Sequence, residues 1–344
     1  MFEYYPWSKQ EYQNCLAHYQ DGNFSILDIE LGGECNYNCV YCDSPERSRK
    51  CKISLDDLER LISQNSYRWI YICGLGEPTF KNNYTLLIEL LKLCEAYGIH
   101  CSIFSNISNL SDELLEYIKK GVLYILFKYD SREKLAVKSL YGITKPDEQL
   151  EAIEKLKSCI RREGNTTNVA ASIVPTQLNR TEIIPIVREC VDVGIFPLLG
   201  ELELSGKGQM NYQNLYLNQA ELSEIKEKID EICGETYSIP VCPAVVNGLH
   251  FSSDSDITVD AFSGLSCHWF WLKEPQTKKI MHFDHRTSAE EIAGRIFQYR
   301  ESCVKNVKSF LSSLQSVGGA FGGCGGDITR LFQDYLALEE RREK

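Results

Sequence analysis

The sequence predicts an α/β protein with a partial, TIM-like (β/α)6 barrel, followed by a small C-terminal α+β domain made of a β-hairpin plus helices. Two observations predict the barrel. Short apolar or β-branched runs alternate with helical patterns from residue 24 to about 205, and most helical patterns stop near a glycine. The C-terminal domain is predicted because this alternation then ends and two short alternating runs follow a single helix.

Six apolar runs predict the strands: residues 25–31, 69–73, 99–104, 122–127, 169–174 and 195–199. Apolar stripes at helical spacing predict the helices between them: residues 54–62, 86–94, 111–120, 150–160 and 183–191. Strands that alternate with helices pair in parallel through right-handed crossovers, so six units form a barrel that is open on one side. Functional sites in such folds lie at the carboxyl ends of the strands.

The composition is that of a soluble protein. The chain has 344 residues, of which 43% are hydrophobic and 25% charged. No apolar stretch approaches 18 residues and the N-terminus does not resemble a signal peptide, so a cytoplasmic protein without a membrane partner is expected. The net charge of −11 argues against a broad nucleic-acid surface. Fifteen cysteines in such a chain indicate clusters and reduced thiols rather than a disulfide framework.

The most informative motif follows the first predicted strand, where Cys35, Cys39 and Cys42 have the spacing C-x3-C-x2-C. A four-iron four-sulfur cluster normally takes four thiolates, so three on one loop leave one iron open to another ligand. A zinc knuckle or chance spacing are the alternatives. The motif resembles the signature of the radical S-adenosylmethionine (radical SAM) enzymes.

That resemblance implies a [4Fe-4S] cluster whose open iron binds S-adenosylmethionine (SAM). Electron transfer then breaks the sulfonium to give a 5′-deoxyadenosyl radical. Tyr41 occupies the aromatic position that packs near the adenine in the family.

The loop after the second predicted strand reads Gly74-Leu-Gly76-Glu77-Pro78. Its two glycines allow close approach of the backbone to a ligand. The loop is similar to the family's Gly-Gly-Glu-Pro element, which holds the amino group of SAM, although Leu75 replaces the second glycine. The resemblance therefore implies that Glu77 accepts a hydrogen bond from that ammonium group.

The next two strand ends carry further candidates for SAM binding. Ser105 and Asn106 are similar to the start of the family's Thr-Asn-Gly, with Ile107 in place of the glycine. Lys128 and Ser131 follow the fourth strand, where related enzymes contact the carboxylate and ribose of SAM. The alternative is that this lysine and serine lie on a solvated loop.

The C-terminal part contains a predicted hairpin between residues 248 and 262. Cysteines before and after it, Cys242 and Cys267, resemble the start of the auxiliary-cluster domains called SPASM and twitch. Together with Cys303 and Cys324 they would hold a second, auxiliary [4Fe-4S] cluster, with Cys233 or a substrate group as the alternative to Cys303. The resulting expected organisation is an N-terminal segment 1–23, the radical SAM barrel 24–205, a bridging segment 206–235 and a twitch/SPASM-like domain 236–344.

The resemblance implies hydrogen abstraction from a substrate, followed by oxidation or epimerisation. Epimerisation needs a thiol hydrogen donor, for which Cys73, Cys101 and Cys233 are candidates. We expect a small carbohydrate-like or cyclitol substrate, because the roughly 23 residues before the first strand are too few for a winged-helix module that holds a leader peptide. The alternatives are a maturase that epimerises or cross-links a ribosomally made peptide, and a non-catalytic cluster scaffold or electron carrier. The enzymatic hypotheses require a flavodoxin or ferredoxin as electron donor.

Overall fold

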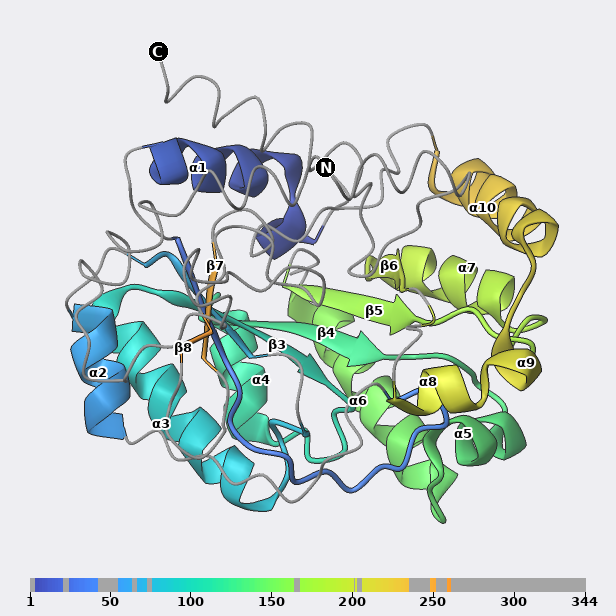
Figure 1. Cartoon of the computed structure of the whole chain (residues 1–344), viewed down its shortest axis with the longest axis horizontal. Coiled ribbons are helices and arrows are strands. Elements are labelled where there is room, and N and C mark those ends of the chain that lie inside the picture. Colours follow the sequence, from blue (N-terminus) through green and yellow to red (C-terminus); the bar gives the residue numbers. More distant parts are fainter. Residues whose placement is uncertain are drawn as a thin grey trace, which may run out of the picture.

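The structure of the protein is a computed structural model. It describes residues 4–20, 25–42, 55–63, 67–72, 76–163, 168–200, 202, 206–234, 248–251 and 259–260. Within them lies one eight-stranded sheet with the order β6-β5-β4-β3-β2-β1-β7-β8. Neighbouring strands from β1 to β6 pair in parallel, which confirms the predicted open barrel of six parallel strands (Figure 1).

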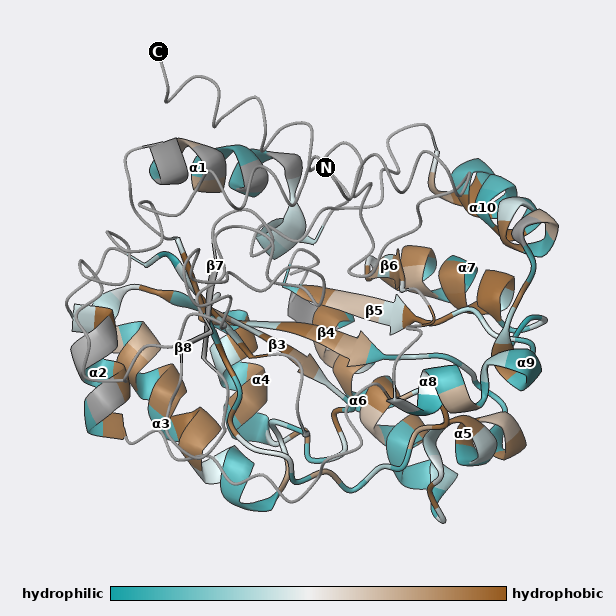
Figure 2. Cartoon of the chain, viewed as in Figure 1, coloured by the Kyte–Doolittle hydropathy of each residue, from teal (hydrophilic) through white to brown (hydrophobic). Residues whose placement is uncertain are grey.

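The barrel strands lie close to their predicted positions. They are β1 (Ile26–Ile29), β2 (Trp69–Ile72), β3 (His100–Ser105), β4 (Leu123–Lys128), β5 (Val169–Ile173) and β6 (Phe196–Leu199). Strands β1, β2 and β5 are buried along their whole length. Most of their residues are apolar because a parallel sheet is covered on both faces. Figure 2 shows the matching apolar colour on the central strands and on α7.

Six helices connect the barrel strands or follow their loops: α2 (Leu55–Ser63), α3 (Lys81–Tyr97), α4 (Asp112–Lys119), α5 (Lys134–Tyr141), α6 (Pro146–Glu163) and α7 (Ile183–Val193). The predicted stops at Gly98 and Gly194 are left-handed C-caps with φ of 67° and 78°. Ser111 caps α4 by accepting a hydrogen bond from the Leu114 amide. None of the described helices is long and apolar enough to cross a bilayer.

The C-terminal hairpin is present but does not stand apart from the barrel. Strands β7 (Gly248–Phe251) and β8 (Val259–Asp260) pair antiparallel, as the sequence predicts. Strand β7 also pairs in parallel with β1, so the hairpin extends the sheet at its β1 edge. The sequence pattern does not predict this pairing, because nothing local in either strand specifies its partner.

Two of the helices that were not predicted contribute to the candidate site or the barrel interior early in the chain. One is α5, and the other is α1 (Lys9–Gln20), which follows the short 3-10 helix η1 (Tyr5–Trp7). In Figure 1, α1 lies on the side of the sheet opposite α2, α3 and α4. Tyr4 bonds Ser102 of β3 at 3.0 Å, and the Tyr71 hydroxyl donates to the Pro6 carbonyl at 3.0 Å. The N-terminal segment therefore fills part of the barrel's inner face.

The N-terminal helix is fixed to β2 by a buried carboxylate. Glu11 of α1 accepts hydrogen bonds from Arg68 at 2.9 and 3.0 Å and from the Trp69 indole at 2.8 Å. Burial of the carboxylate opposes its ionisation, but the hydrogen bonds from Arg68, Trp69 and Asn14 outweigh burial and lower the pKa of Glu11 to about 2. The carboxylate is therefore ionised at neutral pH and paired with Arg68.

Candidate functional site

The candidate site is built around the cysteine loop, residues 31–42, which leaves the carboxyl end of β1. The last turn of α5 holds this loop through two backbone hydrogen bonds. The Asn38 amide donates to the Tyr141 carbonyl at 2.8 Å, and the Val40 amide donates to the Leu140 carbonyl at 2.9 Å. Gly142, with φ of +59°, ends α5 so close to the loop that a Cβ there would lie 2.6 Å from the Asn38 carbonyl oxygen. A glycine is therefore required at this contact.

The three loop cysteines are gathered on one short segment. Cys39 is buried, while Cys35 and Cys42 are half-buried. Burial raises the pKa of Cys39 to about 12, and the neighbouring thiols of Cys35 and Cys42 act in the same direction, although Lys128 opposes this shift. The Cys39 thiol is therefore protonated in the metal-free protein, and metal binding would release its proton.

Three thiols on one loop are a donor set that fits an iron–sulfur cluster. Among the described residues, no three side chains of His, Cys, Asp or Glu are arranged to hold one ion. A cubane cluster does not require three side chains around one ion, because each cysteine binds a different iron. The three thiols on one loop can therefore hold three irons of a four-iron cluster.

The loop that carries Gly76 and Glu77 packs directly on the cysteine loop. Gly76 has φ of +80°, and a Cβ there would lie 1.9 Å from the Gly32 carbonyl oxygen. The Glu77 amide donates to the Glu34 carbonyl at 2.9 Å. The side-chain amide of Asn83, on α3, donates to the carbonyls of Gly32, Glu34 and Glu77 at 3.0–3.2 Å. Asn83 thus joins the two loops, and the sequence analysis did not identify it.

The Glu77 carboxylate is almost completely occupied by protein donors. Its Oε1 accepts from the Thr79 amide at 2.9 Å, the Thr79 hydroxyl at 2.7 Å and the Ser105 hydroxyl at 2.6 Å. Its Oε2 accepts from the Asn106 amide at 2.7 Å. Burial raises the pKa of Glu77 and these hydrogen bonds oppose that shift. Three of these four donors share Oε1. Oε2 accepts one hydrogen bond from the described residues, and a carboxylate oxygen has two lone-pair directions, so Oε2 has room for one further donor.

The end of β3 is held in a strained conformation beside the cysteine loop. Ile107, at the position of the family's glycine, has φ of +50° and is fully buried. A β-branched residue in this region is an outlier that surrounding contacts must hold in place. Here the side-chain amide of Asn106 donates to the Asn36 side chain at 3.0 Å, and Asn36 donates to Ser108 at 2.9 Å.

Asp130, just after β4, is a buried acid that is hydrogen-bonded to several parts of the site. No motif in the sequence marks it. Its carboxylate accepts hydrogen bonds from the Tyr41 hydroxyl and, at 2.6 Å, from the Val174 amide. Its backbone amide donates to the Tyr141 hydroxyl at 2.9 Å. Burial raises the pKa of Asp130, while Lys128 and these hydrogen bonds oppose the shift. Asp130 therefore links the cysteine loop to the ends of β4, β5 and α5.

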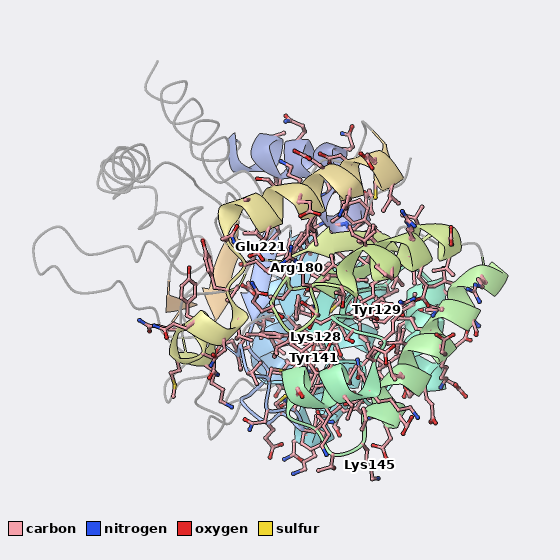
Figure 3. The ribbon with its side chains drawn as sticks, turned by 90° about the vertical axis from the view of Figure 1, so that its right-hand side faces the viewer. Lys128, Tyr129, Tyr141, Lys145, Arg180 and Glu221 are labelled. Atoms are coloured by element: carbon pink, nitrogen blue, oxygen red, sulfur yellow. The ribbon has the colours of Figure 1, made fainter. Side chains whose placement is uncertain are left out.

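Lys128 and Ser131 flank Asp130 and differ in their surroundings. The Lys128 ammonium lies 4.9 Å from the centre of the Tyr41 ring and 5.0 Å from that of Phe104, which makes two cation–π contacts. Lys128 is labelled in Figure 3. The Ser131 hydroxyl is buried and accepts a hydrogen bond from the Glu133 amide at 3.0 Å. Lys128 is therefore beside the cysteine loop, whereas Ser131 takes part in the local turn that leads into α5.

Two of the three candidate hydrogen donors, Cys101 and Cys233, lie among the described residues. Cys101 is buried against Cys94 of α3, on the helix-facing side of the sheet, and this contact together with burial raises its pKa. Cys233 is half-buried at the end of α10 (Gln219–Cys233), and burial raises its pKa to about 11. The remaining predicted residues lie outside the described residues: Cys73, Gly74, Cys242, Cys267, Cys303 and Cys324.

Comparisons with known proteins agree with this geometry. Residues 29–187 match the family model of the Radical SAM superfamily. A probable GTP 3′,8-cyclase from Thermococcus kodakarensis is 26% identical over 217 residues, which cover 61% of this chain and 67% of that protein. Residues 29–187 thus form a radical SAM domain.

Two solved structures share the fold. SuiB of Streptococcus suis bound to SAM aligns with a TM-score of 0.53 and 19% identity, over 76% of this chain and 66% of SuiB. The protein anSMEcpe with bound SAM aligns with a TM-score of 0.55 and 14% identity, over 78% of this chain and 79% of that one. Both proteins have also been solved with peptides, SuiB with its precursor peptide SuiA. The chain spans just under two thirds of the length of SuiB.

Proposed function

We propose that this protein is a radical SAM enzyme in which Cys35, Cys39 and Cys42 hold a [4Fe-4S] cluster that binds SAM. The main observation behind the proposal is that three loops from neighbouring strand ends are hydrogen-bonded to one another. The cysteine loop, the Glu77 loop and the Asn106 loop are joined by hydrogen bonds through Asn83, Glu77 and Asn36. When bound, the cluster supplies the electron that cleaves the sulfonium of SAM into methionine and a 5′-deoxyadenosyl radical.

The chain's own residues position and shield the reactants. The remaining acceptor direction of Glu77, on Oε2, would receive the ammonium group of SAM, since the others are occupied by the protein. The Lys128 ammonium, beside the Tyr41 ring, supplies a positive charge for the carboxylate of SAM or of the substrate. The Tyr41 ring is fixed through Asp130 and would form one wall beside the adenine. The surrounding apolar strands exclude water from the radical.

For the substrate, we propose a peptide rather than the small carbohydrate-like or cyclitol molecule that the sequence favoured. The support is that SuiB and anSMEcpe, which align over more than three quarters of this chain, have been solved with peptides bound. Oxidation, epimerisation or cross-linking of that peptide are the reactions to test. An auxiliary cluster held by Cys242, Cys267, Cys303 and Cys324, and an external flavodoxin or ferredoxin, remain part of the proposal.

The test is anaerobic reconstitution followed by iron counting and dithionite reduction with SAM. Replacing Cys35, Cys39 and Cys42 together with alanine should remove about four irons and abolish formation of 5′-deoxyadenosine. Cys159→Ala is the control, because Cys159 is a half-buried thiol away from the cysteine loop, on α6. Unchanged iron in the triple variant would contradict the assignment of these ligands. Incubation with peptides encoded beside the gene, followed by mass spectrometry, tests the substrate class.

A further inference from the structure

A short segment after β6 contacts the cysteine loop and has no role in the function proposed so far. It contains the helices α8 (Gly206–Met210) and α9 (Tyr212–Leu215). We call residues 206–215 the clamp segment. Asn211 is separated from its partner in the cysteine loop by 171 residues of sequence, so this contact arises only in the folded protein.

The clamp segment makes three hydrogen bonds with the half of the loop that carries Cys39 and Cys42. The Lys207 amide donates to the Cys42 carbonyl at 2.8 Å. The side-chain amide of Asn211 donates to the Val40 carbonyl at 2.8 Å, and the Lys207 ammonium donates to the Asn38 side chain. The amides of Asn38 and Val40 are bound by α5, so the stretch 38–42 is fixed from two sides.

The clamp segment is itself anchored firmly at its far end. Leu215 is buried, and its carbonyl accepts a hydrogen bond from the Gln177 amide at 2.9 Å, in the loop after β5. Three residues later, Asn218 and Glu221 form a capping box that starts α10. Glu221 also pairs with Arg180 of the β5 loop at 2.5 Å, and Figure 3 shows these two side chains together. The segment therefore connects the β5 loop and α10 to the cysteine loop.

We propose that Asn211 and Lys207 are positioning residues that hold the cysteine loop in the conformation that retains the cluster. This inference rests on the proposed function. Asn211 contributes a neutral donor to a loop carbonyl one residue from Tyr41 and two from Cys42. Loss of that donor leaves the Val40 carbonyl without this partner and frees the loop to move away from the clamp segment. Iron should then leave the loop more readily even though all three cysteines are present.

The experiment measures the rate at which a chelator removes iron from anaerobically reconstituted protein. Asn211→Asp keeps the shape of the side chain but replaces the donor with a charged acceptor facing the Val40 carbonyl. Asn214→Asp is the matched control, since Asn214 is exposed on α9 and gains the same charge. We expect Asn211→Asp to release iron on the order of ten times faster than the wild type, and Asn214→Asp to match the wild type.

A second readout separates positioning from general stability. The electron paramagnetic resonance spectrum of the reduced protein should change in Asn211→Asp and not in Asn214→Asp, while the thermal midpoints of the two iron-free variants should be similar. Equal iron release and equal spectra in the two variants would overturn the inference. If Asn211→Asp does not fold, the rate of iron release is measured on Lys207→Met instead. This variant removes only the side-chain hydrogen bond from Lys207 to Asn38. Faster release would support the inference, and release at the wild-type rate would refute it.

The failure of the proposed function would look different. In that case the wild-type protein and the variant lacking Cys35, Cys39 and Cys42 would hold the same amount of iron. The clamp inference fails on its own when the wild type holds cluster iron on these cysteines and Asn211→Asp retains it equally well.

Discussion

Gly142 and Gly98 offer a direct test of the contact between α5 and the cysteine loop. Both glycines are left-handed C-caps, with φ of 59° and 67°. They differ in their surroundings. A Cβ at Gly98 would meet nothing within 4 Å, whereas a Cβ at Gly142 would lie 2.6 Å from the Asn38 carbonyl oxygen and 3.1 Å from its carbon. Replacement of each glycine with alanine therefore introduces the same backbone strain, but only Gly142→Ala introduces a clash.

The expected magnitudes follow from this difference. Alanine in a left-handed conformation costs about 1 kcal/mol of unfolding free energy, which is the expected effect of Gly98→Ala. Gly142→Ala adds a clash with backbone atoms that cannot rotate away, and overpacking of this kind costs roughly a further 1 to 3 kcal/mol. The loop must move to relieve it, so Gly142→Ala should also retain less iron after reconstitution, while Gly98→Ala should retain as much as the wild type.

The assay is urea unfolding of the iron-free proteins, with the free energy obtained by linear extrapolation. Iron content after reconstitution is measured on the same preparations. Equal losses of stability in the two variants would refute the argument, because they would show that α5 does not approach the cysteine loop as closely as the structure indicates. Lower iron in Gly98→Ala would refute the proposed link between this contact and cluster retention.

Two further predictions concern buried carboxylates. Because the pKa of Glu11 is lowered to about 2, its ionised form stabilises the fold above about pH 5, and that contribution, on the order of 3 kcal/mol, is lost as the pH falls from about 5 toward 2. The stability difference between wild type and Glu11→Gln should therefore shrink over this range, and a difference independent of pH would contradict the pairing with Arg68. The second prediction concerns the hydrogen bond from the Tyr41 hydroxyl to the Asp130 carboxylate. Asp130→Asn and Tyr41→Phe should each lower the free energy of unfolding by about 1 to 3 kcal/mol, and the double variant should lose less than the sum of the two single losses. Additive losses in urea unfolding would show that the two side chains do not interact.

Much of the barrel is predictable from sequence because its signals are local. The buried strands β1 and β2 are short runs of mostly apolar residues, and Gly98 and Gly194 end their helices where a left-handed residue is required. The helix α1 escaped prediction because its buried positions include the carboxylate of Glu11, so its apolar stripe is weak. The helix α5 was not predicted, and with eight residues it is a short helix.

The parts of the candidate site that belong to a sequence motif were predictable. The residues whose hydrogen-bond partners lie in distant segments were not. The cysteine spacing and the Glu77 loop stand out in the sequence. Asp130 does not, because its carboxylate is satisfied by Tyr41 and Val174, which lie 89 and 44 residues away. Asn211 depends in the same way on a loop 171 residues earlier. A buried polar residue that serves a distant loop leaves no periodic pattern, and only the folded chain reveals it.

The pairing of β7 with β1 means that the sheet cannot be completed until residues 248–251 have been synthesised. Strand β1 pairs with β2 on one edge, but its other edge is covered by residues 248–251, which are synthesised roughly 220 residues later. Until then β1 presents unpaired backbone groups beside the cysteine loop, and exposed strand edges of this kind recruit other chains. A chain that stops before residue 248 would keep all six barrel strands and yet be prone to self-association through β1. The C-terminal hairpin thus covers the edge of β1, and among the described strands this side of the sheet ends instead at β8, which has only two residues.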